Sequence, residues 1–166
     1  MTTGVGTVLA GLTGLAALGA ALVAGVLLAF SAFVMRALDA LPPAAAVAAM
    51  QQVNRFAPGP GLLVPLMGTA GLCVVLAVLA VVSLATGPSS HGWLVLVGCV
   101  LYLVAFGITA GYHVPRNDAL ALVDPTATGT ADVWRAYAGP WVLLNHVRTA
   151  AAALGAAALL ASLVHR

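Results

Sequence analysis

Four long runs of apolar residues, separated by shorter polar segments, set the pattern of this chain. The runs cover residues 5–35, 62–86, 92–112 and 141–164. An α-helix rises about 1.5 Å per residue, so a run of about 20 residues crosses the hydrocarbon core of a bilayer. Each run is long enough to do so, and the pattern therefore predicts four membrane-spanning helices.

The polar segments contain residues that begin or end helices. Two prolines at 42–43 open a short helix over residues 44–56, because proline is tolerated in a first helical turn. The Pro/Gly stretch 58–61 ends that helix, and Pro115 is expected to break the third span at its end. Short connections favour antiparallel neighbours. We therefore expect an all-α, up-down four-helix bundle with short interfacial helices on one face, forming a single transmembrane domain over residues 1–166.

Composition places the chain in a membrane. Of its residues, 63% are hydrophobic and 6% are charged, and its mean hydropathy is +1.11, whereas soluble domains carry about a quarter charged residues. We therefore expect an integral membrane protein whose partner is the lipid bilayer. A net charge of +2 is too small to suggest nucleic acid. Cys73 and Cys99 lie inside apolar runs and are expected to be small core residues, not a disulfide or metal ligands.

Positive charge is distributed unequally between the two ends of the predicted bundle. The first and third connections both follow an odd-numbered crossing of the membrane, so they lie on the same side of it. Five of the six arginines fall on that side, namely Arg36, Arg55, Arg116, Arg135 and Arg148, with Arg166 at the other end. Arginine and lysine accumulate in cytoplasmic loops. The bias predicts a multi-pass protein of the cell membrane with its polar end in the cytoplasm and both termini outside.

Segment 134–149 is unlike the rest of the chain, because aromatic, amide, imidazole and guanidinium groups crowd into it. The apolar residues that follow, 150–164, span only about 22 Å as a helix, so the fourth span must begin near Asn145 or earlier. His146 and Arg148 are thereby drawn to the membrane boundary. Ionisable groups at that depth are costly and suggest a functional site. The alternative is an interfacial anchor, in which the arginine reaches the headgroups and the tryptophans form an aromatic belt.

One face of the fourth span combines groups suited to proton transfer. At about 100° per residue, Trp141, Asn145, Arg148 and Thr149 share one arc, with His146 at its edge. A histidine can take a proton from a carbon or phenol acid, an arginine can hold the resulting oxyanion, and an amide can add a hydrogen bond. We therefore expect His146, Arg148 and Asn145 to be catalytic.

Polar and aromatic residues from other segments are expected to converge on the same site, because both long connections lie at one end of the bundle. Aromatic rings can sandwich a flat aromatic ligand, and amides can hydrogen-bond to its substituents. The residues expected to bind the substrate are Gln51, Asn54, Asn117, Trp134, Tyr137 and Trp141. Each of them alone also has a structural explanation, as a helix cap, a loop turn or a membrane-interface residue.

Two alternatives stay open at the level of sequence. One is a bound metal ion, because His113, Asp118 and His146 would supply two imidazoles and a carboxylate, although no tight spacing joins them. The other is a non-catalytic protein, such as a small transporter or an assembly subunit, whose polar cluster binds a small molecule or a partner. The chain has no HExxH sequence, phosphate-binding glycine loop or serine nucleophile elbow. The sequence also leaves a homo-oligomer open.

Short motifs along the chain resemble those of a known family. They are Phe30-Ser31-Ala32-Phe33-Val34-Met35 with Leu38, Ala49-Met50-Gln51 with Asn54, Val114-Pro115 with Asn117 and Leu120, Trp134 with Tyr137, and Trp141 with Asn145-His146-Val147-Arg148-Thr149. In these motifs the chain resembles the anthrone oxygenases, a family of small four-helix membrane proteins. The resemblance implies oxidation of a hydrophobic anthrone to an anthraquinone by molecular oxygen in polyketide pathways, with neither a flavin nor a heme motif.

The chain departs from the family pattern at two places. His113 stands where asparagine is expected before Val-Pro, and Pro58-Gly59-Pro60 stands in place of Asn-Pro. These departures bear on the identity of the substrate more than on the fold. We expect the protein to act on an anthrone-like or other phenolic aromatic molecule and on molecular oxygen, either without a cofactor or, in the alternative, with a bound metal ion.

Overall fold

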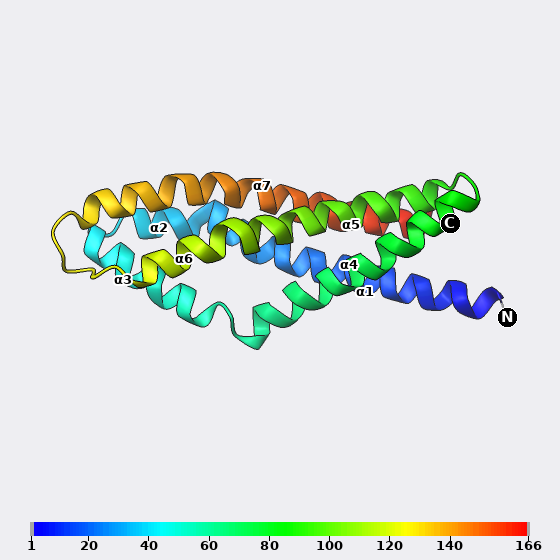
Figure 1. Cartoon of the computed structure of the whole chain (residues 1–166), viewed down its shortest axis with the longest axis horizontal. Coiled ribbons are helices and arrows are strands. Elements are labelled where there is room, and N and C mark those ends of the chain that lie inside the picture. Colours follow the sequence, from blue (N-terminus) through cyan, green and yellow to red (C-terminus); the bar gives the residue numbers. More distant parts are fainter. Residues whose placement is uncertain (1, 166) are drawn as a thin grey trace.

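The computed structural model describes residues 2–165, and every regular element in this range is helical. The chain forms four long helical rods; the rods run along the molecule, and a shorter helix lies at one end of it (Figure 1). The first rod is α1 (Thr2–Ala29), η1 (Phe30–Val34) and α2 (Met35–Asp39), followed by the shorter α3 (Pro43–Phe56); the second is α4 (Pro60–Thr86); the third is α5 (Ser90–Ile108), η2 (Thr109–His113) and α6 (Val114–Ala121); the fourth is α7 (Thr130–Val164). Each rod is long and apolar enough to cross a membrane, which confirms the predicted all-α membrane bundle. Arg166, which enters the charge count above, lies outside the described residues.

Two predicted helix boundaries are wrong. The fourth helix begins at Thr130 and not near Trp141, because Trp134 and Tyr137 recur at helical spacing and are buried against the rest of the bundle. The third helix does not break before Pro115. The chain passes through η2 and continues to Ala121, and Pro115 falls in the first turn of α6, where a missing backbone N–H is tolerated.

Small residues bring the rods close together in the membrane half of the bundle. The core of this half is drawn from α1, α4, α5 and α7 and consists mainly of Ala, Val and Leu, with Cys73 and Cys99 buried in it as free thiols. One close approach of two backbones joins α5 to α7. A Cβ added to Gly98 would lie 3.0 Å from the carbonyl oxygen of Gly155, and one added to Gly155 would lie 2.9 Å from that of Gly98. Such close backbone contact is how helices associate in lipid.

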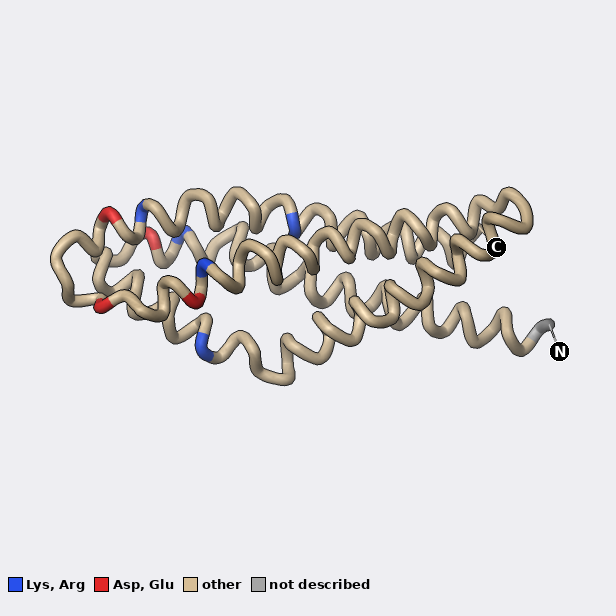
Figure 2. Tube along the Cα trace, in the orientation of Figure 1, with Lys and Arg blue, Asp and Glu red and all other residues tan. Residues whose placement is uncertain are grey.

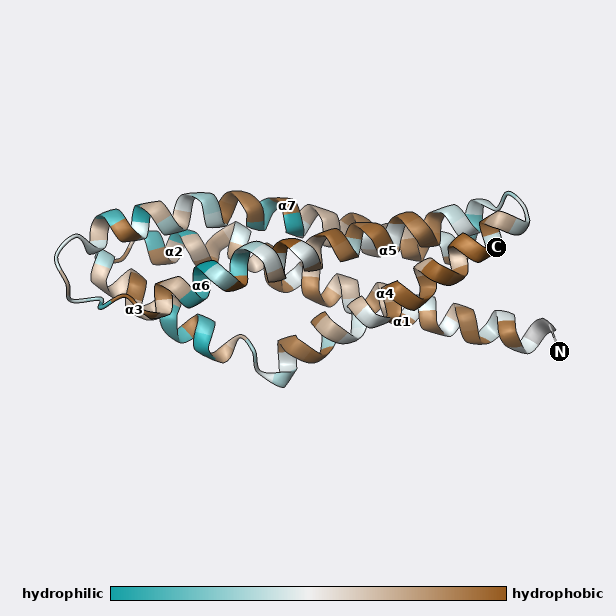
Figure 3. Cartoon of the chain, viewed as in Figure 1, coloured by the Kyte–Doolittle hydropathy of each residue, from teal (hydrophilic) through white to brown (hydrophobic). Residues whose placement is uncertain are grey.

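A second core fills the other end of the bundle, which we call the polar half. Its buried residues come from α2, α3, α6 and the first part of α7. The helix α3 packs on α2, α6 and α7, whereas α4 packs mainly on α1 and α5, so these two helices cover different halves of the molecule. Charged residues gather in the polar half (Figure 2), where hydrophilic positions are also frequent (Figure 3), and both termini lie at the opposite end.

Candidate functional site

A layer of polar side chains separates the two apolar cores. Its members are Ser31 from η1, Thr109 and His113 from η2, and Asn145, Arg148 and Thr149 from α7. Along each of these three rods the layer residues lie between positions of the membrane core and positions of the second core. Both π turns of the structure thus occur at the level of this layer, and π turns inside α-helices are frequent at functional sites.

The centre of the layer is the guanidinium of Arg148, whose side chain is 5% exposed. Its Nε donates to Oδ1 of Asn145 at 2.9 Å, and one terminal nitrogen donates to Oγ1 of Thr109 at 3.2 Å. The guanidinium carbon lies 5.2 Å from the centre of the Trp141 ring. Among the described residues, no carboxylate is within ion-pair distance of it. A buried cation held only by neutral groups is expensive to maintain, so we expect it to serve a function.

Asn145 connects Arg148 to the first rod through hydrogen bonds. Its side chain is fully buried, and its Nδ2 donates to the carbonyl oxygen of Leu27 at 2.9 Å and to Oγ of Ser31 at 2.7 Å. The Thr149 hydroxyl donates to the backbone oxygen of Asn145 at 2.6 Å and lies 3.5 Å from Ser31 Oγ. The proton of Ser31 therefore has no acceptor nearer than 3.5 Å among the described residues, which leaves it available for a ligand.

His146 faces the opposite way from Arg148. It is exposed, and it lines an open groove of about 620 Å³ between α1 and α7. Small apolar residues form most of the groove, and its polar members are Ser31, His146 and Thr149. The complete lining is Ala21, Ala24, Gly25, Leu28, Ser31, His146, Thr149, Ala150, Ala153, Ala156, Ala157 and Leu160. The groove is thus mainly apolar, and an imidazole and a polarised hydroxyl form part of its walls.

The family model of the anthrone oxygenases matches residues 62–158, more than half of the chain. The chain belongs to the anthrone oxygenase family. No curated protein and no solved structure has a significant match to it. In this anthrone oxygenase family member the matched range includes Thr109, Asn145, His146 and Arg148, whereas Ser31 precedes it.

The aromatic residues predicted to bind substrate are packed into the second core of this anthrone oxygenase family member. The Tyr137 hydroxyl and the Trp141 indole N–H both donate to Oδ1 of Asn117, at 2.8 and 3.0 Å. The Trp134 indole N–H donates to Oδ1 of Asp39 at 2.9 Å. All three rings are at most 5% exposed. The polar tips of these rings are therefore occupied by protein partners, and the rings pack against one another in the core.

The two amides predicted on α3 also lie in the polar half. The side-chain nitrogen of Gln51 donates to the carbonyl oxygens of Leu120 and Val123, at 2.9 and 2.8 Å, and so ties α3 to the end of α6. Asn54 faces the Tyr137 hydroxyl, but its buried amide nitrogen forms no hydrogen bond within the described part of the chain. The structure brings Asn54, Tyr137 and Asn117 together and places Gln51 on the same helix as a structural tie.

The three residues of the metal alternative, His113, Asp118 and His146, do not come together in the described structure. The His113 ring is buried, with Nδ1 3.3 Å from the carbonyl oxygen of Ile108 and Nε2 3.2 Å from that of Trp141. Asp118 is exposed, and His146 faces the groove on another side of α7. Within residues 2–165, no group of three His, Cys, Asp or Glu side chains could hold a metal ion.

Two functional candidates escaped the sequence reasoning. Ser31 lies inside the first apolar run and Thr109 inside the third, so the pattern predicts each only as part of a membrane span. A hydroxyl residue in an otherwise apolar span is a weak signal of a functional site, because serine and threonine can donate a hydrogen bond to a carbonyl oxygen of their own helix. Thr109 does so with the carbonyl oxygen of Ala105 at 2.9 Å. Only the contact with Asn145 distinguishes Ser31 from such a case.

Proposed function

We propose that the protein is a membrane oxygenase that oxidises an anthrone-like or other phenolic aromatic substrate with molecular oxygen, and that the reaction takes place in the groove between α1 and α7. One observation carries the proposal: His146 and Ser31 share an apolar groove between two candidate membrane spans, and Ser31 is linked through Asn145 to the buried cation of Arg148. Membership of the anthrone oxygenase family supports the reaction class.

The groove suits a flat, poorly soluble substrate. Its walls are mostly alanine with glycine and leucine, and apolar surfaces with a few placed polar groups are typical of small-molecule sites. Because the groove is open and lies between two candidate membrane spans, an aromatic molecule dissolved in lipid can enter it without crossing water. The substrate then lies with its reactive carbon beside the imidazole of His146.

Proton removal is the first chemical step that the residues can support. An anthrone carries a CH₂ group opposite a ring carbonyl, and loss of one of its protons delocalises negative charge onto that oxygen. His146 accepts the proton as a general base. The Ser31 hydroxyl donates to the developing oxyanion, and it is a stronger donor because Asn145 donates to its oxygen while accepting from Arg148.

Reaction with oxygen follows from the electron-rich carbon. The anion passes electrons to O₂, a C–O bond forms, and the proton held by His146 returns to the terminal oxygen to give a hydroperoxide. Loss of the second C–H proton with cleavage of the O–O bond releases water and leaves a new carbonyl group. One substrate molecule and one O₂ thus give one quinone and one water, and two electron pairs move from carbon to oxygen.

The proposed orientation places the polar half of the bundle in the cytoplasm. The arginines of the first and third connections support it, because positive residues are retained on the cytoplasmic side. In this orientation the His146 end of the groove faces the cytoplasmic half of the membrane. A quinone product would leave sideways into lipid or toward the cytoplasm through the polar half.

An aerobic assay of the purified protein tests the proposal. The protein in lipid nanodiscs is given anthrone, and quinone formation is followed by absorbance together with oxygen uptake, with and without a chelator and alongside metal analysis. We expect quinone and oxygen uptake in equal amounts above the spontaneous rate. Binding of anthrone without any acceleration would contradict the oxygenase and favour the non-catalytic binding protein. Loss of activity on chelation would show that a metal ion takes part.

A further inference from the structure

A second cavity, of about 410 Å³, lies between α2 and α7 in the polar half. Its lining consists of Ser31, Met35, Arg36, Asp39, Arg135, Ala138, Gly139 and Val142. Ser31 lines both this cavity and the groove that holds His146. The two spaces therefore meet at the hydroxyl that we place at the reacting oxyanion.

Both spaces follow one seam between the first rod and α7. On α7, the residues that line them include Arg135, Gly139, Val142 and His146, which recur every three or four positions and so share one face of the helix. From Arg135 to His146 the helix rises about 16 Å at 1.5 Å per residue. The seam is thus continuous. Its lining changes along its length from apolar residues, through a hydroxyl and an imidazole, to charged residues.

The charged end of the seam carries more positive than negative groups. Two guanidiniums, of Arg36 and Arg135, and one carboxylate, of Asp39, line it. The Asp39 carboxylate already accepts the indole N–H of Trp134. Two cations and one acid give the lining an excess of one positive charge, which Asp132, outside the lining, balances through its ion pair with Arg135.

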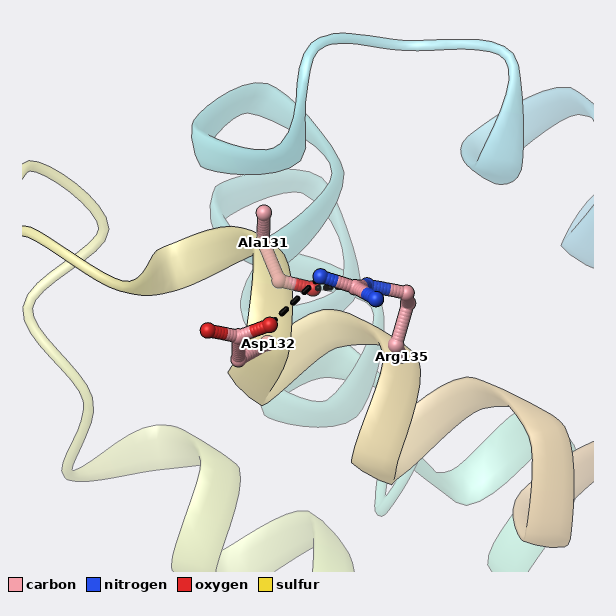
Figure 4. Close-up of polar contacts among 3 residues, drawn as sticks. All are labelled: Ala131, Asp132 and Arg135. Atoms are coloured by element: carbon pink, nitrogen blue, oxygen red, sulfur yellow. Dashed lines mark hydrogen bonds and ion pairs between the residues drawn. The ribbon is translucent and has the colours of Figure 1, made fainter.

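Both arginines can accept an anionic ligand, Arg36 directly and Arg135 by exchange of its present partner. No hydrogen bond or ion pair joins the side chain of Arg36 to another residue of the described chain. Arg135 pairs with Asp132 and also donates to the carbonyl oxygen of Ala131 (Figure 4). The side chains of that pair are 75% and 79% exposed, and such surface pairs contribute little. A ligand carboxylate can therefore displace Asp132 at small cost.

We propose that the substrate of this seam is an aromatic acid, with fused phenolic rings in the groove beside His146 and a carboxylate between Arg36 and Arg135. The inference rests on the proposed function and adds the substrate class to it. A neutral anthrone would fill the apolar groove and leave the charged end empty. A carboxylate matches the planar fork of a guanidinium and gains charge-assisted hydrogen bonds from it.

Two stable probes test the proposal without turnover: anthraquinone-2-carboxylate and its neutral amide, anthraquinone-2-carboxamide. Their dissociation constants are measured by equilibrium dialysis against the full-length protein in nanodiscs of neutral lipid. We expect the carboxylate to bind roughly tenfold more tightly than the amide, as two partly exposed ion pairs would provide. The double variant Arg36→Gln with Arg135→Gln should lose this preference and still bind the amide, which shows that it is folded. Arg55→Gln, which removes an exposed arginine outside the seam, should keep the preference.

Three results would overturn the inference. The first is equal binding of the two probes by the unmodified protein, and the second is a preference for the carboxylate that survives in the double variant. The third is a preference that disappears when the nanodisc contains anionic phosphatidylglycerol, because the arginines would then bind lipid headgroups. Failure of the proposed function looks different. In that case Gly25→Leu, which fills the groove, leaves binding of both probes unchanged. If Gly25→Leu blocks both probes but the unmodified protein binds them equally, only the proposal of an acidic substrate is contradicted.

Discussion

The guanidinium of Arg148 is held at 2.9 Å by the side-chain oxygen of Asn145, and a neutral amide thus takes the place that a carboxylate usually occupies beside a buried arginine. A carboxylate would cancel the charge. The amide leaves it intact and orients it, because its oxygen faces Arg148 while its nitrogen faces Ser31. The pair therefore keeps a positive potential directed at the groove in a medium of low dielectric constant, where such a potential acts most strongly.

Replacing Arg148 with methionine should separate function from stability. The change removes a charge that has no counter-ion and leaves one amide oxygen unpaired, and these effects roughly cancel. We expect the free energy of unfolding to change by no more than about 1 kcal/mol and turnover to fall about 100-fold. Thermal unfolding in detergent and the oxygen-uptake assay measure the two quantities.

Asn145→Ala is the matched comparison for that variant. It leaves the buried guanidinium without its nearest partner, so we expect a loss of about 3 kcal/mol of stability. If Arg148→Met destabilises the protein more than Asn145→Ala does, the arginine is a structural residue and the functional interpretation of the layer is wrong.

His146→Ala should abolish turnover without harming the fold. The side chain is exposed and forms no hydrogen bond with another described residue, so unfolding should be almost unchanged. A positioned general base contributes about 100- to 10,000-fold, and we expect a loss in that range in kcat. His165→Ala, at an exposed histidine near the end of α7, is the control. Near-native turnover in a folded His146→Ala protein would remove the general-base role.

Ser31→Ala should reduce kcat and leave substrate binding nearly intact. The hydroxyl is proposed to meet charge that develops only during the reaction, and loss of one such donor lowers kcat by about 100- to 1,000-fold. Steady-state kinetics with separate kcat and KM values provide the test. Ser83→Ala, at an exposed serine of α4, is a control. A rise in KM at constant kcat would instead make Ser31 a binding residue.

Gly25→Leu should block the groove. A Cβ at Gly25 would meet nothing within 4 Å, so the leucine can extend into the groove without displacing backbone. We expect the dissociation constant of an aromatic ligand to rise roughly tenfold or more, equivalent to about 1.4 kcal/mol of lost binding. Gly71→Leu is a matched control, because that position in α4 is equally open and lies outside the groove. Equal effects of the two changes would place the ligand elsewhere.

Accessibility labelling tests the proposed orientation. Single cysteines at Thr128, in the α6–α7 connection, and at Ser90, at the start of α5, are both exposed positions at opposite ends of the bundle. With an impermeant thiol reagent, Thr128→Cys should react only from the cytoplasmic side and Ser90→Cys only from outside. The parent protein provides the background, because Cys73 and Cys99 are buried. The reverse pattern would place both termini in the cytoplasm.

Hydropathy sufficed for the four spans because a bilayer selects for length and apolarity, which are properties of a segment and not of its neighbours. The helix ends were harder. Residues 130–140 continue α7 because Trp134 and Tyr137 pack against helices far away in the sequence, and Pro115 is accommodated because η2 precedes it. Both features depend on tertiary context.

The residue types of the candidate site could be predicted from the sequence, but the directions in which their side chains point could be predicted only in part. Asn145 and Arg148 do lie together, as their shared arc suggested. His146 follows Asn145 directly, and the rotation of about 100° between neighbouring helical residues places it on the outer surface of α7. The sequence does not give the position of α1, so it could not show whether Asn145 or His146 faces a ligand. The hydrogen bonds of the aromatic residues could not be predicted for a related reason, because their acceptors Asn117 and Asp39 belong to other elements.

The π turn η1 keeps the side chains of α2 in place on the first rod. A π turn closes over one residue more than an α turn, so η1 behaves as an α-helix with a single inserted residue. The wider turn absorbs that residue, and α2 therefore keeps the direction relative to α1 that an uninterrupted helix would give it. Deleting one exposed residue there, such as Ala32, would restore α geometry and leave Arg36 and Asp39 at the seam, whereas a deletion in the regular part of α1 would rotate α2 by about 100°. One-codon deletions in η1 are therefore a route by which such a protein can reshape the turn that contains Ser31 and retain both ends of the seam.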